Sequence, residues 1–400
     1  DFCYAKRDGT RHPPSVRYVS RPDKTGRLMI MIHKQRVLDS FLEYVQIDSE
    51  TGNEKAMAER MTEELRALGG VVSTDSAGEA VGSNGFNVYA RFEGTLPGEV
   101  LLYAAHMDTV KPGCGVKPVI RDGIIYSSGD TILGGDDKSG IAGIIEAIRS
   151  IKEEGIPHRT FEVAFTISEE GGLRGAKNLD YSRIRAKYGI ALDSSGEVGK
   201  IITQAPGQIK IHADVIGKTA HAGIAPEQGI SAIQAAASGV ARMKLLRIDE
   251  ETTANIGVFK AEYATNIVPD RVSILAETRS RNLDKLNAQA KHMVDCLQAG
   301  CDEYGATLDC RCETNYVSYH LADDHPLVSE LSGAIRSMGI EPLITSTGGG
   351  SDTNIFNLNG IDSVVLATGM SKVHTTNEFI KVEQLERTAE LLYRLMTTAN

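Results

Sequence analysis

Five short stretches of the sequence carry the side-chain types that zinc binds in proteins. Two histidines, two aspartates and one glutamate suit a pair of zinc ions that share one carboxylate. Two metal ions about 3.5 to 4 Å apart hold a water between them and acidify it, so the set predicts hydrolytic chemistry. The stretches are His106-Met107-Asp108, Gly135-Asp136-Asp137-Lys138, Ser168-Glu169-Glu170-Gly171-Gly172, Ala191-Leu192-Asp193 and Val373-His374-Thr375.

The histidine and aspartate stretches also have ordinary explanations. Taken alone, His106 is more often a satisfied core histidine at a strand end than a ligand. Asp108 follows two residues later and shares its strand face, so its carboxylate can orient the imidazole. Asp136 and Asp137 at a helix start would interact with the helix dipole. That explanation is strong for Asp137 and weaker for Asp136, because the preceding glycines also allow a tight turn beside a metal ion.

The Glu169-Glu170 pair follows an apolar run and precedes two glycines. Charged pairs are common on surface turns, but adjacent carboxylates can also divide two roles, one binding metal and the other moving a proton. The combination is more specific than any member. In open α/β sheets, ligands bind at the carboxyl ends of strands, and four of the five stretches follow a strand while the fifth opens a helix.

The elements that must hold these residues are read from hydrophobic patterns. Residues 28–68 have a helical pattern that ends at a glycine pair. Three mainly apolar runs, at about 100–105, 161–167 and 188–192, predict strands covered on both faces. A helix from Ile141 to about Glu153 lies between two of them, which indicates an α/β layer domain.

The pattern changes near Pro206. From there the order strand, helix, strand, strand, helix, strand predicts a ferredoxin-like α+β domain, and α/β character resumes at Pro326. We therefore expect a catalytic domain in two segments, 28–205 and 316–400, with an inserted lid at 206–315. Residues 1–27 are basic and lack apolar periodicity. We interpret them as a mobile extension, with a small strand appendage as the alternative.

Composition excludes several functions. The 400 residues carry a net charge of −10, which argues against a nucleic-acid partner. No apolar run reaches the roughly 18 to 20 residues of a membrane span, so we expect no membrane partner. The six cysteines form no CxxC pair, and we interpret them as reduced thiols of a cytoplasmic protein.

The motifs resemble those of the M20 metallopeptidase family, most of all its peptidase T-like branch. The resemblance covers about residues 28–400 and implies a three-layer α/β/α zinc-peptidase domain with a dimerising lid. It rests on the order and spacing of four stretches, His106-Met107-Asp108-Thr109-Val110, Gly135-Asp136-Asp137-Lys138, Glu169-Glu170-Gly171 and Asp193. Two stretches in the lid, Thr219-Ala220-His221-Ala222-Gly223 and Asn266-Ile267-Val268-Pro269-Asp270, also resemble motifs of the family.

The resemblance also implies roles for the residues of the centre. His106 and Asp193 would bind one zinc ion, Glu170 and His374 the other, and Asp136 would bridge them, with cobalt or manganese as substitutes. Glu169 would be the general base and Asp108 the group that orients His106. The peptide bond between Asp136 and Asp137 should be cis.

In the lid, the resemblance assigns three residues to the substrate. His221 would donate a hydrogen bond to the oxyanion and come from the partner subunit of a homodimer. Asn266 would lie near the same carbonyl. Arg279 follows the apolar strand 272–277, and its fork can hold a substrate carboxylate bidentately. The alternative is an ordinary surface arginine.

These assignments predict hydrolysis of short peptides with release of N-terminal residues. The turn Gly348-Gly349-Gly350-Ser351-Asp352 lacks the arginine expected of tripeptidases in this branch, which leaves tripeptide specificity open. A dipeptidase or an amidohydrolase acting on N-acyl amino acids would use the same metal centre. A non-catalytic binding protein on this fold is a further alternative, although such a protein would need no base at Glu169.

Overall fold

The structure is a computed structural model that describes residues 32–398, so the predicted extension at 1–27 lies outside the described residues. Within the described range the largest sheet has nine strands, in the order β1-β2-β6-β3-β7-β16-β8-β14, with β15 paired to β8. Its strands are β1 Val71–Thr74, β2 Val88–Phe92, β3 Leu96–His106, β6 Arg159–Thr166, β7 Tyr188–Ser194, β8 Lys200–Ala205, β14 Tyr319–His320, β15 Leu343–Ser346 and β16 Asp362–Ala367.

The centre of this sheet is parallel. Strands β6, β3, β7 and β16 run in one direction, so their carboxyl ends meet at one edge. Their residues are buried on both faces over most of their length, as the mainly apolar runs predict. The helices around the sheet are α1 Lys34–Val45, α2 Lys55–Ala67, α3 Ala77–Val81, α4 Gly135–Glu154, α5 Arg174–Lys177, α8 Pro326–Ser337, α9 Asp352–Leu358 and α10 Val382–Thr397.

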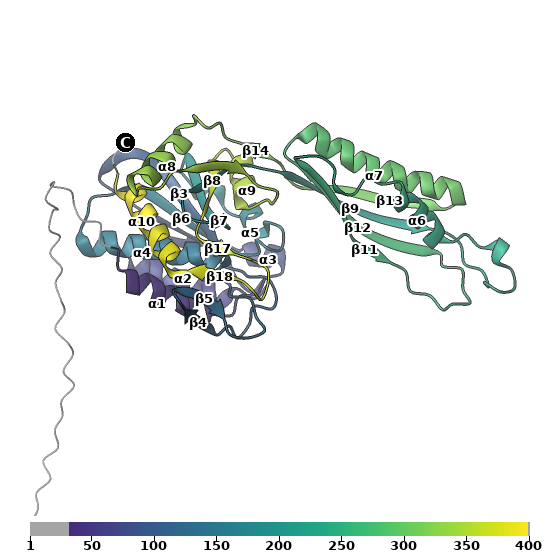
Figure 1. Cartoon of the computed structure of the whole chain (residues 1–400), viewed down its shortest axis with the longest axis horizontal. Helices are drawn as coiled ribbons and strands as arrows, with labels where there is room; N and C mark the ends of the chain where they lie inside the picture. Colours follow the sequence, from purple (N-terminus) through teal and green to yellow (C-terminus); the bar gives the residue numbers. More distant parts are fainter. Residues whose placement is uncertain (1–31, 399–400) are drawn as a thin grey trace, which may run out of the picture. The chain divides into compact units, whose positions relative to one another are not determined.

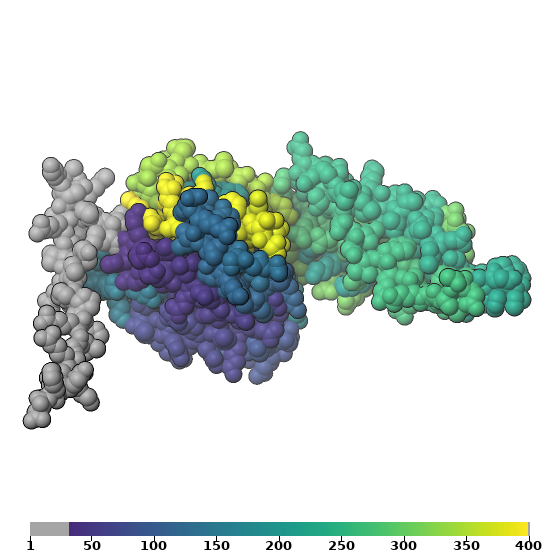
Figure 2. Space-filling view, turned by 60° about the horizontal axis from the view of Figure 1, so that its bottom comes forward, coloured from purple at the N-terminus to yellow at the C-terminus, as the bar shows by residue number. Residues whose placement is uncertain are grey.

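Helices cover the sheet on both faces (Figure 1). On one face α4 packs against β3 and β7 and is itself covered by α1 and α10. It is buried almost all round because isoleucines recur along it. On the other face α5 and α9 pack on Leu102, Ala104 and Ala164. Figure 2 shows the C-terminal segment, in yellow, lying against the purple and blue segments from the first third of the chain.

Residues 207–316, here called the inserted module, form a second sheet of five antiparallel strands in the order β10-β11-β12-β9-β13. The elements run in the predicted order, with the two-residue strand β10 as an addition. They are β9 Gly207–Ile216, α6 Ala232–Ala241, β10 Leu246–Arg247, β11 Thr252–Lys260, β12 Arg271–Ser280, α7 Leu283–Tyr304 and β13 Thr307–Tyr316. Alternate apolar residues of β9 and β12 pack with α6 and α7, so the polar residues between them occupy the opposite face.

A third sheet in the described part of the chain has four short strands that the sequence did not predict. They are β4 Pro118–Arg121, β5 Ile124–Ser127, β17 Met370–Ser371 and β18 Phe379–Lys381. The loop between β17 and β18 carries His374, so this small sheet fixes a residue of the predicted centre. Among residues 32–398, no helix combines the length and hydropathy that crossing a membrane requires.

Candidate metal centre

The fold brings the predicted donors to one edge of the large sheet. His106 is the last residue of β3, and Glu169 and Glu170 lie in the turn after β6. Asp193 lies near the end of β7, the parallel neighbour of β3 on its other side. Asp136 enters from the first turn of α4, where its backbone departs from helical geometry. The peptide bond between Asp136 and Asp137 is cis, which confirms that prediction.

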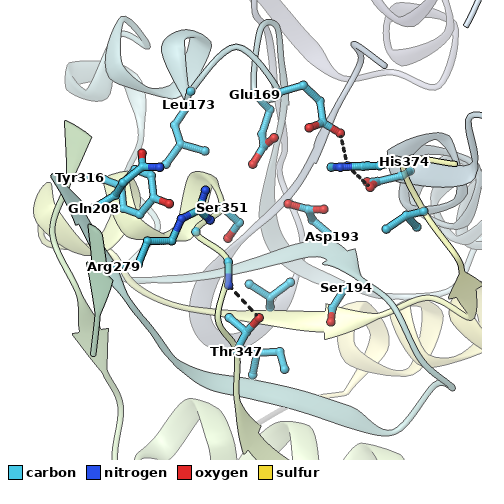
Figure 3. A pocket seen from close by; sticks show the side chains of 18 of the residues that line it. Glu169, Leu173, Asp193, Ser194, Gln208, Arg279, Tyr316, Thr347, Ser351 and His374 are labelled. Carbon is cyan, nitrogen blue, oxygen red and sulfur yellow. Dashed lines mark hydrogen bonds and ion pairs between the residues drawn. The ribbon is translucent and has the colours of Figure 1, made fainter. Parts of the chain in front are cut away.

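The two carboxylate oxygens of Asp136 face different histidines. Oδ1 lies 3.1 Å from Nε2 of His106, which is also 3.8 Å from Oδ1 of Asp193. Oδ2 lies 3.2 Å from Nε2 of His374, which is also 2.7 Å from Oε1 of Glu170 (Figure 3). The five side chains therefore form two adjacent groups joined through one carboxylate.

This donor set fits two divalent cations. His106 is grouped within 4.8 Å with Asp136 and Glu170, and also with Glu169 and Asp193. Imidazole nitrogens and carboxylate oxygens are ordinary zinc ligands. The carboxylates around the histidines favour the positively charged imidazoles, as they would favour a cation. Hydrogen bonds to Asp136 and Glu170 raise the pKa of His374 to about 10. Burial raises the pKa of Asp193 to about 7.

Asp108 contacts the centre differently from the prediction. Its backbone carbonyl, 2.8 Å from Nδ1 of His106, takes the hydrogen bond, while its carboxylate is 3.6 Å from that nitrogen. The carboxylate instead accepts backbone N–H groups of Glu169 at 2.9 Å and Glu170 at 3.2 Å. Its Oδ2 also accepts the hydroxyl of Thr51 at 2.7 Å. Asp108 thus fixes both the histidine and the turn that carries the two glutamates.

Glu378 is a buried residue of this region that the sequence analysis missed. It is 1% exposed. Its carboxylate accepts the backbone N–H of Gly134 at 2.8 Å and of Asp136 at 3.1 Å. Glu378 follows His374 by four residues, so it ties the loop of that histidine to the loop of Asp136. The only sequence signal was its place in the stretch His374-Thr375-Thr376-Asn377-Glu378, which the apolar patterns do not mark.

A cavity of about 510 Å³ opens beside the donors, a size typical of small-ligand sites. The side chains of Asp136, Glu169, Glu170, Asp193 and His374 line it. Burial and then the charge of Asp193 raise the pKa of Glu169 well above its ordinary value. The inserted module supplies the rest of one wall, which consists of Gln208, Lys210, Glu277, Arg279, Asn315 and Tyr316.

Arg279 lines the cavity, but from within strand β12 rather than beyond a strand ending at Glu277. Figure 3 shows it beside Gln208 and Tyr316, on the wall opposite His374. Its Nε donates to Oε1 of Glu277 at 2.8 Å and its Nη2 to Oε2 at 3.3 Å. One edge of the guanidinium is therefore already bound. The end formed by Nη1 and the second hydrogen of Nη2 is left to donate to a ligand in the cavity.

His221 and Asn266 lie together, away from this cavity. The backbone N–H of Ala222 donates to the carbonyl of Asn266 at 2.9 Å, and His221 forms an isolated bridge with Ile267. Both His221 and Asn266 are exposed, and neither lines the cavity of its own chain. The structure brings these two predicted residues to each other but not to the donors.

A mixed α/β fold with a joined cluster of histidine and carboxylate donors in a cavity defines a metal-dependent hydrolase. The chain belongs to peptidase family M20/M25/M40, whose family model matches residues 102–398, and it is a metallopeptidase of the peptidase T-like type. The predicted family and mixed α/β class are confirmed.

Three relatives illustrate the match. The chain is 43% identical over 369 residues to uncharacterized protein YqjE of Bacillus subtilis, covering 92% of this chain and 100% of the relative. Aminopeptidase PepT from Bacillus cereus is a solved structure with 45% identity and a TM-score of 0.84, covering 92% and 99% of the two chains. A tripeptidase from Staphylococcus aureus has 41% identity and a TM-score of 0.88 at the same coverage.

Proposed function

We propose that this metallopeptidase uses two divalent metal ions to hydrolyse peptide bonds in short peptides, releasing N-terminal residues. One observation carries the proposal: the oxygens of Asp136 face two separate histidine and carboxylate groups inside a cavity of peptide size. The names of the solved relatives, an aminopeptidase and a tripeptidase, support the substrate class.

The two groups divide the ligands between two ions. His106, Asp193 and Oδ1 of Asp136 would hold one ion, and His374, Glu170 and Oδ2 of Asp136 the other. We propose zinc as the metal, with cobalt or manganese able to substitute, because the donors are imidazoles and carboxylates. Ions held there would polarise the peptide carbonyl and lower the pKa of a bound water.

Glu169 is the proposed general base. It lines the cavity next to the ligand Glu170, and Asp108 fixes its backbone. Its carboxylate lies in the cavity beside the proposed ligands, in position to take a proton from a water bound there. Glu169 then passes that proton to the leaving amine, so the carboxylate is restored at the end of each turnover.

Arg279 is the proposed anchor for the C-terminal carboxylate of the peptide. Glu277 holds one edge of the guanidinium, so the carboxylate would bind end-on. Arg279→Lys should therefore raise KM for peptides with a free C-terminus much more than for the corresponding peptide amides. Equal effects on acids and amides would remove Arg279 from the substrate site.

His221 and Asn266 are proposed to act on the cavity of a partner subunit. Their exposure, and their absence from the cavity of their own chain, supports a homodimer formed through the predicted lid, 206–315. There His221 would donate to the oxyanion, an interaction whose loss typically costs about 10² to 10³ in kcat. The test mixes Glu169→Gln chains with His221→Ala chains. Restored activity after subunit exchange supports action across the dimer, and none after demonstrated exchange contradicts it.

The decisive experiment compares the adjacent glutamates. Glu169→Gln should keep close to two metal ions per chain yet lose roughly 10²-fold or more in kcat. Glu170→Gln, the matched control, should lose metal as well as activity. A panel of tripeptides, dipeptides and N-acyl amino acids identifies the preferred substrate and separates aminopeptidase from dipeptidase and amidohydrolase activity. A folded, metal-loaded wild type that cleaves no peptide, or a Glu169→Gln variant with normal turnover, would overturn the proposal.

A further inference from the structure

A row of polar side chains on the inserted sheet forms one wall of the cavity. Gln208 and Lys210 are two residues apart on β9, and Glu277 and Arg279 are two apart on β12, so each pair shares a strand face. The strands are antiparallel neighbours, with Gln208 opposite Arg279 and Lys210 opposite Glu277. All four residues line the cavity.

The polar partners in this row are already engaged with one another. Glu277 binds Arg279 and also accepts a hydrogen bond from Nε2 of Gln208. Asn315 donates from Nδ2 to Oε1 of Gln208 at 2.6 Å and accepts from Nζ of Lys177 at 2.5 Å. Glu277 and Asn315 therefore each form hydrogen bonds with two residues, neither of which is Lys210.

Lys210 is the member of the row that remains without such a partner. Among residues 32–398, its ammonium group has no hydrogen-bond or ion-pair partner. The side chain is half-buried in the cavity wall, so the ammonium group is available to a ligand in the cavity. Its Nζ lies 3.6 Å from the point that a Cβ on Gly172 would occupy. Gly172 belongs to the turn that carries Glu169 and Glu170, so the ammonium group lies beside the catalytic turn.

Apart from the proposed metal ligands and Glu169, positively charged side chains outnumber negatively charged ones in the cavity lining. Outside the proposed ligands and Glu169, the lining contains three cations, Lys200, Lys210 and Arg279, and one carboxylate, Glu277. The ammonium group of Lys200 donates a hydrogen bond to the backbone carbonyl of Ser195 at 2.9 Å, in the loop just before Lys200. We therefore leave it out of the count of cations available to a ligand. Without Lys200, the wall carries the two cations Lys210 and Arg279 and the one carboxylate Glu277, a net positive charge that favours an anionic ligand.

We propose that Lys210 binds the side-chain carboxylate of an acidic C-terminal residue while Arg279 binds the C-terminal carboxylate of that same residue. This inference rests on the proposed function and gives its substrate class: short peptides ending in glutamate or aspartate. Diagonal neighbours on adjacent strands lie about 7 to 8 Å apart. Two flexible cationic side chains at that spacing can reach both carboxylates of one residue.

The experiment compares Ala-Ala-Glu with Ala-Ala-Gln, which differ in charge and hardly in shape. Wild type should favour the glutamate peptide in kcat/KM by about 5- to 10-fold, the size of a half-buried charged hydrogen bond. Lys210→Met should bring the ratio of the two kcat/KM values near one, and Lys210→Arg should keep the preference. Lys200→Met is the matched control, because Lys200 lines the same cavity but is hydrogen-bonded to Ser195. This variant should also keep the preference for the glutamate peptide.

The possible outcomes distinguish failure of the proposed role of Lys210 from failure of the proposed peptidase function. Wild type that cleaves both peptides equally, or a preference that survives Lys210→Met, overturns the role of Lys210 and leaves the peptidase proposal standing. Cleavage of neither peptide by the metal-loaded wild type overturns the proposed function and this inference with it. Turnover of Ala-Ala-Gln by Lys210→Met shows that the variant is folded.

Discussion

Asp108→Asn tests how the catalytic turn is held. The carboxylate of Asp108 accepts three hydrogen bonds, from the backbone N–H groups of Glu169 and Glu170 and from the hydroxyl of Thr51. Asparagine has nearly the same shape but only one acceptor oxygen, and its NH₂ group can only donate. The hydrogen bond that Nδ1 of His106 donates to the backbone carbonyl of residue 108 is untouched. The change also removes a negative charge 3.6 Å from that nitrogen, so metal content is measured alongside activity.

The expected loss follows from the hydrogen bonds. With its oxygen at the Oδ2 position, asparagine keeps the contacts to Thr51 and Glu170 and places a donor against the N–H of Glu169. One hydrogen bond to a charged acceptor, worth about 1.5 to 3 kcal/mol, is lost. A tenfold change in rate corresponds to about 1.4 kcal/mol, so the full effect on kcat is a fall of about 10- to 150-fold.

The assay measures kcat on a tripeptide together with the metal content of the same sample. Thr51→Val is the matched control, because it removes one neutral donor to the same carboxylate and should lower kcat by about 2- to 10-fold. If folded Asp108→Asn keeps kcat within about threefold of wild type, or if Thr51→Val has the larger effect, the carboxylate does not position Glu169 and the reasoning fails.

Three further changes test other features. Glu378→Gln places an NH₂ group against the N–H donor of either Gly134 or Asp136, which different oxygens of the carboxylate accept, and should weaken metal binding by about 10-fold or more; an unaltered cobalt titration spectrum would contradict this. Gly350→Ala puts a Cβ 2.4 Å from Cζ of Tyr316 in the cavity wall, so KM should rise more than kcat falls, and unchanged steady-state kinetics would count against it. Glu330→Ala leaves the buried guanidinium of Arg159 without its carboxylate and should lower the urea-measured free energy of unfolding by about 3 to 5 kcal/mol; a change below about 1 kcal/mol would show that the pair contributes little.

The donors of the centre were predictable because each lies at the boundary of a strongly patterned element. His106, Glu169 and Asp193 lie at or just after the ends of buried, mainly apolar strands, and Asp136 opens a helix rich in isoleucine. Parallel neighbours bring such ends together, so local pattern was enough to place them at one edge. Their roles in binding metal and moving protons remain proposals.

The supporting residues were not predictable in the same way. Strands β17 and β18 have two and three residues, too few to show a period, so the loop that holds His374 was not recognised. Glu378 acts through backbone N–H groups more than 240 residues away in sequence. The engagement of Arg279 by Glu277 depends on side-chain geometry along β12, which the pattern of apolar residues leaves undetermined.

The inserted module leaves and rejoins the large sheet at neighbouring strands. The chain departs after Ala205 at the end of β8 and returns at Tyr319 in β14, and these two residues are paired. A short turn joining them would preserve the sheet and the proposed ligands while removing Lys210 and Arg279. The residues proposed to select the substrate are therefore encoded in one contiguous tract of the gene, whereas the proposed metal ligands lie on both sides of that tract. A lineage can acquire new peptide preferences by altering or exchanging one uninterrupted tract without disturbing the inherited metal ligands.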